Sequence, residues 1–170
     1  MTSLATTLGL RAASAGAFVP NHAAGYLAFN FAWSYLALAS RHLKQLWGID
    51  HQSAPRDDIA KYGEAAVRSG KITQSQLNML KRNEAAYANS VENYTLLVGA
   101  IGLATAAGVA PEAINRAGLV YSIARVAYGF WYVLVENDTL ALVRALFWYI
   151  GNGSCLYLLW KAGELLTKAA

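Results

Sequence analysis

The sequence predicts an all-α protein, an integral membrane antiparallel four-helix bundle, and two observations carry that prediction. Apolar side chains make up 56% of the 170 residues and charged ones only 14%, which is more apolar than an average soluble domain. Four long apolar segments are joined by short connections, an arrangement that favours antiparallel helices in a membrane. The net charge of +4 is modest, so the composition does not favour nucleic-acid binding.

Residues 1–22 are predicted to form an N-terminal tail that precedes a membrane domain over 23–170. The tail is rich in Ala, Ser and Thr, contains no acid, and has Arg11 as its one charged residue. This composition is typical of a poorly ordered tail, and a cleaved transit segment has a similar one.

The first span is predicted at about 23–43 and the second at about 74–107, with a cytosolic loop at about 44–73. The first span has an uncharged run up to Ser40, which basic residues follow directly, as they do at a membrane surface. Thr73 and Gln76 form the pattern of a capping box, so the second helix is expected to begin there. At 1.5 Å per residue that helix is roughly 50 Å long, and it begins in water and ends in lipid.

The third span is predicted at about 113–135 and the fourth at about 139–165. Arg125 is the only charged residue of the third apolar run, and Arg144 is the only one of the fourth up to Trp160. The polar residues at 136–138 form the turn between these two spans.

Basic residues are concentrated on one side of the predicted bundle. Of the 14 Lys and Arg residues, eight lie in or at the ends of the first loop: Arg41, Lys44, Arg56, Lys61, Arg68, Lys71, Lys81 and Arg82. Because positive loops stay in the cytosol, this loop and the turn at 136–138 are predicted to be cytosolic, with both termini on the far side. The three glycosylation sequons, at Asn93, Asn137 and Asn152, are then expected to carry no glycan.

Polar side chains form one stripe on the second span and another on the third. The first stripe consists of Arg82, Ala86, Asn89 and Asn93, with Glu92 beside it; the second consists of Tyr121, Arg125, Tyr128 and Tyr132. Carboxylates and amides at membrane depth are costly and usually functional. Span order places Asn89, Glu92, Tyr128, Tyr132 and Arg144 at a similar depth below the cytosolic surface, which predicts a site there. The simplest partner for Arg125 is Glu92, so we expect an ion pair between them.

The pattern Arg-x-x-x-Ala-x-x-Asn-x-x-Glu-Asn over 82–93 resembles the signature of the MAPEG family, the membrane-associated proteins in eicosanoid and glutathione metabolism. The segment 125–132, Arg-Val-Ala-Tyr-Gly-Phe-Trp-Tyr, is similar to the third-helix motif of that family. Arg144 resembles its fourth-helix arginine. The resemblance covers roughly Arg41 to the C-terminus.

This resemblance implies a homotrimeric transferase or peroxidase of the endoplasmic reticulum that uses glutathione as co-substrate and no metal, with its site facing the cytosol. Arg144 would be catalytic, because a fixed guanidinium beside the glutathione sulfur favours the thiolate. The thiolate would attack a lipophilic electrophile or hydroperoxide dissolved in membrane lipid. The glutathione-binding residues implied are Arg41, Arg82, Asn89, Glu92, Asn93, Arg125, Tyr128 and Tyr132.

Three positions depart from the family pattern. Ala85 stands where many members have Arg, Tyr87 where others have His or Gln, and Ala145 where the prostaglandin synthase has Ser. Weaker glutathione binding is therefore expected, and prostaglandin isomerase chemistry is disfavoured. Two alternatives stay open: a non-catalytic family member that binds and presents a lipid, and a small channel or scaffold.

Overall fold

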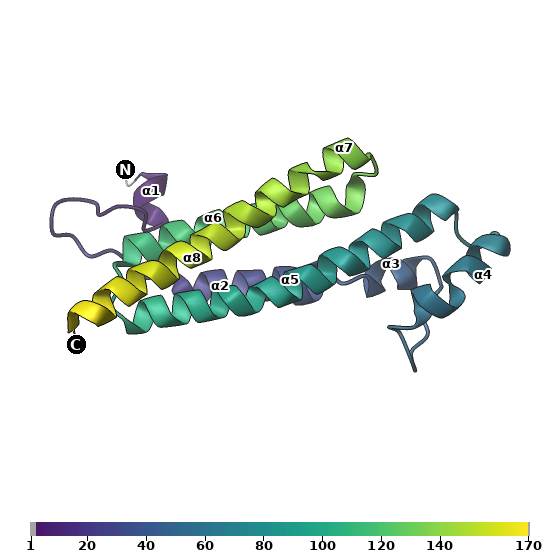
Figure 1. Ribbon diagram of the computed structural model, residues 1–170, viewed down its shortest axis with the longest axis horizontal. Coiled ribbons are helices and arrows are strands. Elements are labelled where there is room, and N and C mark those ends of the chain that lie inside the picture. Colours follow the sequence, from purple (N-terminus) through teal and green to yellow (C-terminus); the bar gives the residue numbers. More distant parts are fainter. Residues whose placement is uncertain (1–2, 170) are drawn as a thin grey trace.

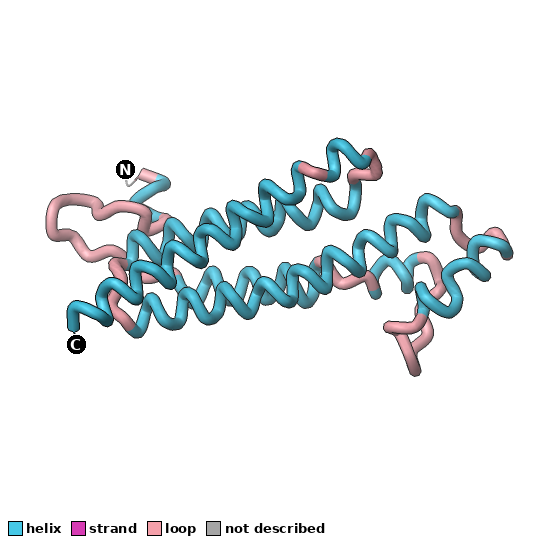
Figure 2. The backbone as a smooth tube through the Cα atoms, in the orientation of Figure 1, coloured by secondary structure: helices cyan, strands magenta, loops and turns pink. Residues whose placement is uncertain are grey.

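The computed structural model describes residues 3–169, which are mostly helical and contain no strand (Figures 1 and 2). The all-α prediction is confirmed. The α-helices are α1 (Leu4–Thr7), α2 (Ala23–Phe31), α3 (Arg41–Leu46), α4 (Gly63–Arg68), α5 (Gln74–Ala106), α6 (Pro111–Leu134), α7 (Asp138–Ala141) and α8 (Val143–Ala169). Two π-helical segments, η1 (Ala32–Ala37) and η2 (Asp58–Tyr62), complete the described chain.

The long helices α5, α6 and α8 pack against one another, and α2 packs against α6 and α5. Both chain ends lie toward one end of the molecule, and α3, α4 and α7 lie toward the other (Figure 1). Within residues 3–169, two segments are long and apolar enough to cross a membrane: Pro111–Leu134 and Asp138–Ala169.

Local signals explain where the longest helix begins and where the next one starts. The backbone N–H of Gln76 donates to Thr73 Oγ1 at 3.2 Å, and the backbone N–H of Thr73 donates to Gln76 Oε1 at 2.7 Å. This reciprocal capping box fixes the start of α5 as the sequence predicted. Gly108 follows the end of α5 with φ of +74°, a conformation that suits glycine, and Pro111 then occupies the first turn of α6.

The segment predicted as the first span, about 23–43, is not one continuous α-helix. The α-helix α2 gives way to the wider η1, and the chain leaves helical structure before α3 begins at Arg41. At this break the side-chain amide of Asn83 on α5 donates to the backbone oxygen of Leu38 at 2.9 Å. A side chain of α5 therefore satisfies a carbonyl that a continuous helix would have bonded itself.

Two separate apolar cores hold the chain together. One lies where α5, α6 and α8 meet, and includes Leu97, Ile101, Ile114, Tyr121 and Leu158. The other lies under the loop 44–73 and consists of Ile49, Ile59, Ala66, Ile72, Leu77 and Leu80. Because it contributes to this second core, the loop is docked on the first turns of α5 although its sequence is hydrophilic.

The N-terminal segment, expected to be poorly ordered, is anchored to α6. Asn115 is fully buried, and its side-chain amide donates to the backbone oxygens of Gly9 at 3.0 Å and Pro20 at 2.8 Å. Its Oδ1 accepts from the backbone N–H of His22 at 2.8 Å. One asparagine thus joins three points of the segment, a long-range arrangement that local sequence patterns do not reveal.

Candidate functional site

Arg125 and Asn89 connect α6 to α5 at membrane depth. Arg125 is 2% exposed, and its Nη2 donates to the Asn89 side-chain oxygen at 2.9 Å. Its other two guanidinium nitrogens, Nε and Nη1, are buried without a hydrogen-bond partner. A buried cation with so few partners is costly, so we treat this part of α6 as a candidate site.

Aromatic contacts extend the set from Arg125 to α8. The Arg125 guanidinium lies 4.5 Å from the centre of the Tyr128 ring, and the rings of Tyr128 and Tyr132 pack edge to face with centres 5.5 Å apart. The Arg144 guanidinium lies 4.3 Å from the centre of the Tyr132 ring. Cation–π contacts at these distances are attractive, and they join Asn89 to Arg144 through an unbroken series of contacts across three helices.

The expected ion pair between Arg125 and Glu92 is wrong. Glu92 is exposed, and within the part of the chain that the structure describes it forms no ion pair with Arg125, which bonds to Asn89 instead. Asn89 and Glu92 lie three residues apart, so their side chains leave α5 about 60° apart, and the recorded hydrogen bond of Arg125 goes to Asn89. Asn93 donates to the backbone oxygen of Asn89 at 2.9 Å and so stays beside the set.

The Arg144 side chain is half-buried, and its guanidinium forms no ion pair within the described part of the chain. Among residues 3–169, no carboxylate lies within ion-pair distance of its guanidinium. Its recorded partner is the Tyr132 ring face, which leaves the guanidinium N–H groups able to donate to an anion. The arrangement can therefore bind a negatively charged atom at the edge of α8.

Arg82 lies outside this set and holds the end of α6. Its Nε donates to the backbone oxygen of Val133 at 3.0 Å, and its Nη2 to Glu136 at 2.8 Å. Val133 is in the last turn of α6, where carbonyl groups lack helical partners. These contacts give Arg82 a structural role in joining α5 to the turn before α7.

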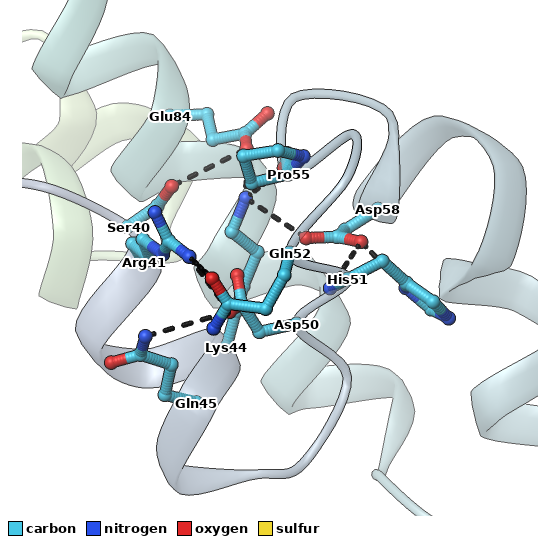
Figure 3. A network of polar contacts seen from close by, with 10 residues as sticks. All are labelled: Ser40, Arg41, Lys44, Gln45, Asp50, His51, Gln52, Pro55, Asp58 and Glu84. Atoms are coloured by element: carbon cyan, nitrogen blue, oxygen red, sulfur yellow. Dashed lines mark hydrogen bonds and ion pairs between the residues drawn. The ribbon is translucent and has the colours of Figure 1, made fainter.

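Arg41 lies in a separate polar network, shown in Figure 3, where α3 and the loop 44–73 meet α5. Its Nη2 donates to Gln52 at 2.5 Å and lies 3.4 Å from Asp50. Beside it is a cavity of about 470 Å³. Arg41, Lys44 and Arg56 line this cavity with positive charge, together with Glu84 and Tyr87 of α5.

The sequence reasoning missed a buried ion pair within this network. Lys44 is 3% exposed and Asp58 is fully buried, with Nζ and Oδ2 3.4 Å apart. Lys44 also lies 3.4 Å from Glu84 and donates to the backbone oxygen of Pro55. His51 donates its backbone N–H to Asp58 at 3.1 Å. The one available signal was the position of Lys44 between the apolar residues Leu43 and Leu46, which argues for a partner.

The two polar regions lie on opposite faces of α5. Arg82 and Asn89 face α6, whereas Glu84 and Tyr87 face the Arg41 cavity. Two residues along a helix turn a side chain by roughly 200°, which explains the division. Of the residues predicted for the site, the structure brings together Asn89, Asn93, Arg125, Tyr128, Tyr132 and Arg144. Arg41 and Arg82 form their contacts elsewhere, and among the described residues Glu92 makes no hydrogen bond or ion pair with the set.

No metal-binding constellation accompanies these regions. Within the described chain, no group of three or more His, Cys, Asp or Glu side chains is placed to hold a metal ion.

The fold and the polar set define a class of protein: an all-helical membrane protein with arginine and tyrosine side chains gathered between its helices. The comparison with family models then identifies the family. The model of the MAPEG family matches residues 22–163, so the chain belongs to this family of membrane proteins of eicosanoid and glutathione metabolism. No curated protein and no solved structure matches the chain.

Proposed function

We propose that the protein is a membrane glutathione transferase, with glutathione-dependent peroxidase activity at the same site. The observation that carries the proposal is Arg144, a cation without a carboxylate partner among residues 3–169, at the end of the contact series from Asn89. Family membership supports it, because the family acts in glutathione metabolism. The proposed assembly is a trimer of four-helix membrane domains built from α2–η1, α5, α6 and α8.

Arg144 is assigned the activation of the glutathione thiol. A free thiol has a pKa of about 8.5, so only a few per cent is thiolate at neutral pH. A guanidinium that donates to the sulfur stabilises the anion and lowers the pKa of the bound thiol. Tyr132 holds this guanidinium by its ring face, and Tyr128 holds Tyr132 in turn.

The activated thiolate has two proposed reactions. With an electrophile, the sulfur forms a bond to carbon and the leaving group departs with the bonding electrons. With a lipid hydroperoxide, the thiolate attacks the terminal oxygen and the O–O bond breaks. The lipid leaves as an alcohol after taking a proton, and the first glutathione is left as a sulfenic acid. A second glutathione converts this sulfenic acid to a disulfide and water.

One tripeptide is proposed to contact two protomers. Because Arg144 and the cavity beside Arg41 lie on opposite sides of α5 within one chain, a glutathione in contact with both is proposed to lie between two protomers. In a trimer, the Arg41 cavity of one protomer is proposed to face the Arg144 side of the next, with the glutathione carboxylates at the cationic cavity and the sulfur at Arg144. The exposed small residues Gly99, Gly102 and Ala106 on α5 support a close contact between protomers.

The proposed location is the endoplasmic reticulum, with the loop 44–73 in the cytosol. Eight of the 14 basic residues of the chain lie in or at the ends of this loop. Glutathione then reaches the site from the aqueous side, and the lipophilic acceptor reaches it from the membrane.

The test is a glutathione titration of the purified protein followed by thiolate absorbance. The wild-type protein is expected to show a thiolate band at neutral pH, Arg144→Ala to lose it, and Arg144→Lys to retain part of it. Arg68→Ala, which changes an exposed arginine on α4, serves as the control. If Arg144→Ala keeps the full band while folding normally, the role of Arg144 is refuted.

The second candidate function is a non-catalytic lipid-binding member of the family. The observation that favours it is the α5 face beside the Arg41 cavity, where Ala85 and Ala88 are exposed and contribute no cation. Conjugation of glutathione to a model electrophile distinguishes the two: turnover that Arg144→Ala abolishes supports the transferase. Glutathione binding without turnover supports the non-catalytic member.

A further inference from the structure

An apolar groove lies between α2 and α6, away from both polar regions. Its volume is about 650 Å³, within the range of about 300–1,000 Å³ that is common for small-molecule sites. Gly25 and Phe29 line it from α2, and Leu119, Ile123 and Ala127 line it from α6. Nearly all of this surface is apolar, so the groove suits a hydrocarbon chain.

The groove and Arg125, the α6 residue that bonds to Asn89, lie on opposite faces of α6. Leu119, Ile123 and Ala127 follow one another at intervals of four residues and form one stripe. Arg125 lies two residues after Ile123, so its side chain leaves the helix roughly 200° away. The groove is therefore separate from the proposed glutathione chemistry.

The N-terminal segment closes one end of the groove. Thr7 and Leu8 contribute to its wall, and the segment that follows them is fixed to α6. Asn115 donates to the backbone oxygen of Gly9, and Arg116 Nη2 donates to that of Leu10 at 2.8 Å. Because α1 occupies this end, a continuous helix of another protein laid along the groove would collide with α1. The groove differs in this respect from an open helix face.

A polar side chain whose buried ring nitrogen has no hydrogen-bond partner among the described residues lies at the same end. His22 lines this end, and its Nε2 is buried with no hydrogen-bond partner. His22 precedes the first residue of α2 at the chain-terminal end of the molecule, where a membrane surface would lie. Away from this end, a second hollow shares Phe29 and continues along η1 past Trp33 and Leu36. The combination is one polar side chain at the closed end of the groove and an apolar path toward the middle of the protein.

We propose that this groove binds one acyl chain of a phospholipid from the leaflet at the N-terminal end, with the ester carbonyl at His22 and α1 over the glycerol region. A polar side chain at one end and an apolar path beyond it match the order of groups in such a lipid. The imidazole donates to the carbonyl in the tautomer that carries its proton on Nε2. The lipid is a structural ligand that ties α1, α2 and α6 together.

The test uses full-length protein in vesicles of dioleoylphosphatidylcholine that contain a small share of phosphatidylcholine with a diazirine in one acyl chain. After illumination, cross-links are expected on the groove residues of α2 and α6. In Gly25→Leu they are expected to fall by about tenfold, as for a loss of 1.4 kcal/mol. A Cβ at Gly25 meets nothing within 4 Å, so the added side chain fills the groove without a clash.

Gly153→Leu is the matched control, because Gly153 on α8 is equally unobstructed and lies outside the groove. Unchanged cross-linking of the groove in Gly25→Leu would overturn the proposal. The proposal would also be overturned if the wild type showed no cross-links in the groove and Gly25→Leu lost the oligomer. The groove would then belong to a second copy of the chain.

A second variant tests the polar end without filling the groove. His22→Phe keeps a ring but removes both nitrogens. Wild-type protein is expected to retain the ester-linked probe about three- to tenfold better than an ether-linked one, as for one hydrogen bond. His22→Phe is expected to abolish this preference. Equal retention of the two probes by wild-type protein would overturn the assignment of the polar end to His22.

Discussion

Arg125 on α6 and Asn89 on α5 are joined by one hydrogen bond of 2.9 Å, and Asn89 is the hydrogen-bond acceptor that the structure records for this buried guanidinium. The carboxylate of Glu92, three residues further along α5, takes no part in it. The neutral amide of Asn89 therefore accepts from only one nitrogen of the guanidinium. The Tyr128 ring adds a cation–π contact to the same guanidinium. The stability of the α5–α6 contact should depend on this pair.

Asn89→Leu is expected to destabilise the protein by about 1.5–3 kcal/mol, because it removes an acceptor from a buried charged donor. A lower midpoint of thermal unfolding in detergent would show this. Asn78→Leu, an exposed asparagine on the same helix, should stay within about 0.5 kcal/mol of wild type. The double variant Asn89→Leu with Arg125→Leu should recover part of the loss. Strict additivity of the two changes would mean that the pair is not coupled.

Arg82→Ala is expected to loosen the end of α6 by about 1–2 kcal/mol, because it removes a bond to a backbone carbonyl and one to a carboxylate. Glu136→Gln should show a smaller loss in the same direction. Hydrogen exchange of the backbone amides in 131–141 measures the effect. If Arg82→Ala weakens glutathione binding strongly while exchange in this segment stays at the wild-type rate, Arg82 contacts the tripeptide directly.

The helix boundaries that were predictable from sequence rest on short-range chemistry. Thr73 and Gln76 are three residues apart and fix the start of α5 by themselves. The anchored N-terminal segment was not predictable, because Asn115 lies 106 residues from Gly9. The break before α3 depends similarly on Asn83, which is 45 residues from Leu38.

The depth of the candidate site was predictable from the sequence, but the contact partners of its residues were not. Span order placed Asn89, Tyr128, Tyr132 and Arg144 at one level, and the structure connects Asn89 to the two tyrosines and Arg144 through Arg125. The choice between an amide and a carboxylate for Arg125 depended on a rotation of about 60° around α5, which residue counting does not resolve. The buried pair of Lys44 and Asp58 was hidden because each residue is typical of a hydrophilic loop.

Lys44→Met is expected to undock the loop 44–73 from α5, at a cost of about 3–5 kcal/mol, because the fully buried Asp58 loses its cation. Faster proteolysis within 50–58 would report this change. Lys61→Met removes an exposed lysine that pairs with Asp57 and should leave the loop protected. Equal protection in both variants would show that the apolar core under the loop holds it alone.

Gly9→Ala is expected to release the N-terminal segment from α6. Gly9 has φ of +63°, and a Cβ there would clash with Asn115 Nδ2 and lie 2.9 Å from the Pro20 backbone oxygen. Gly16→Ala is the matched control: its φ of +77° carries a similar backbone cost, but a Cβ there meets nothing within 4 Å. Any difference between the two variants therefore isolates the contact with Asn115.

Trypsin measures that difference directly, because Arg11 is the only Lys or Arg before Arg41. Cleavage after Arg11 is expected to be about five- to tenfold faster in Gly9→Ala than in Gly16→Ala, the ratio for a loss of about 1–1.4 kcal/mol of anchoring free energy. Cleavage depends on how often the segment opens, so the rate ratio follows this free energy. Equal rates in the two variants would mean that the segment opens without breaking its bonds to Asn115, and that Arg116 alone holds it to α6.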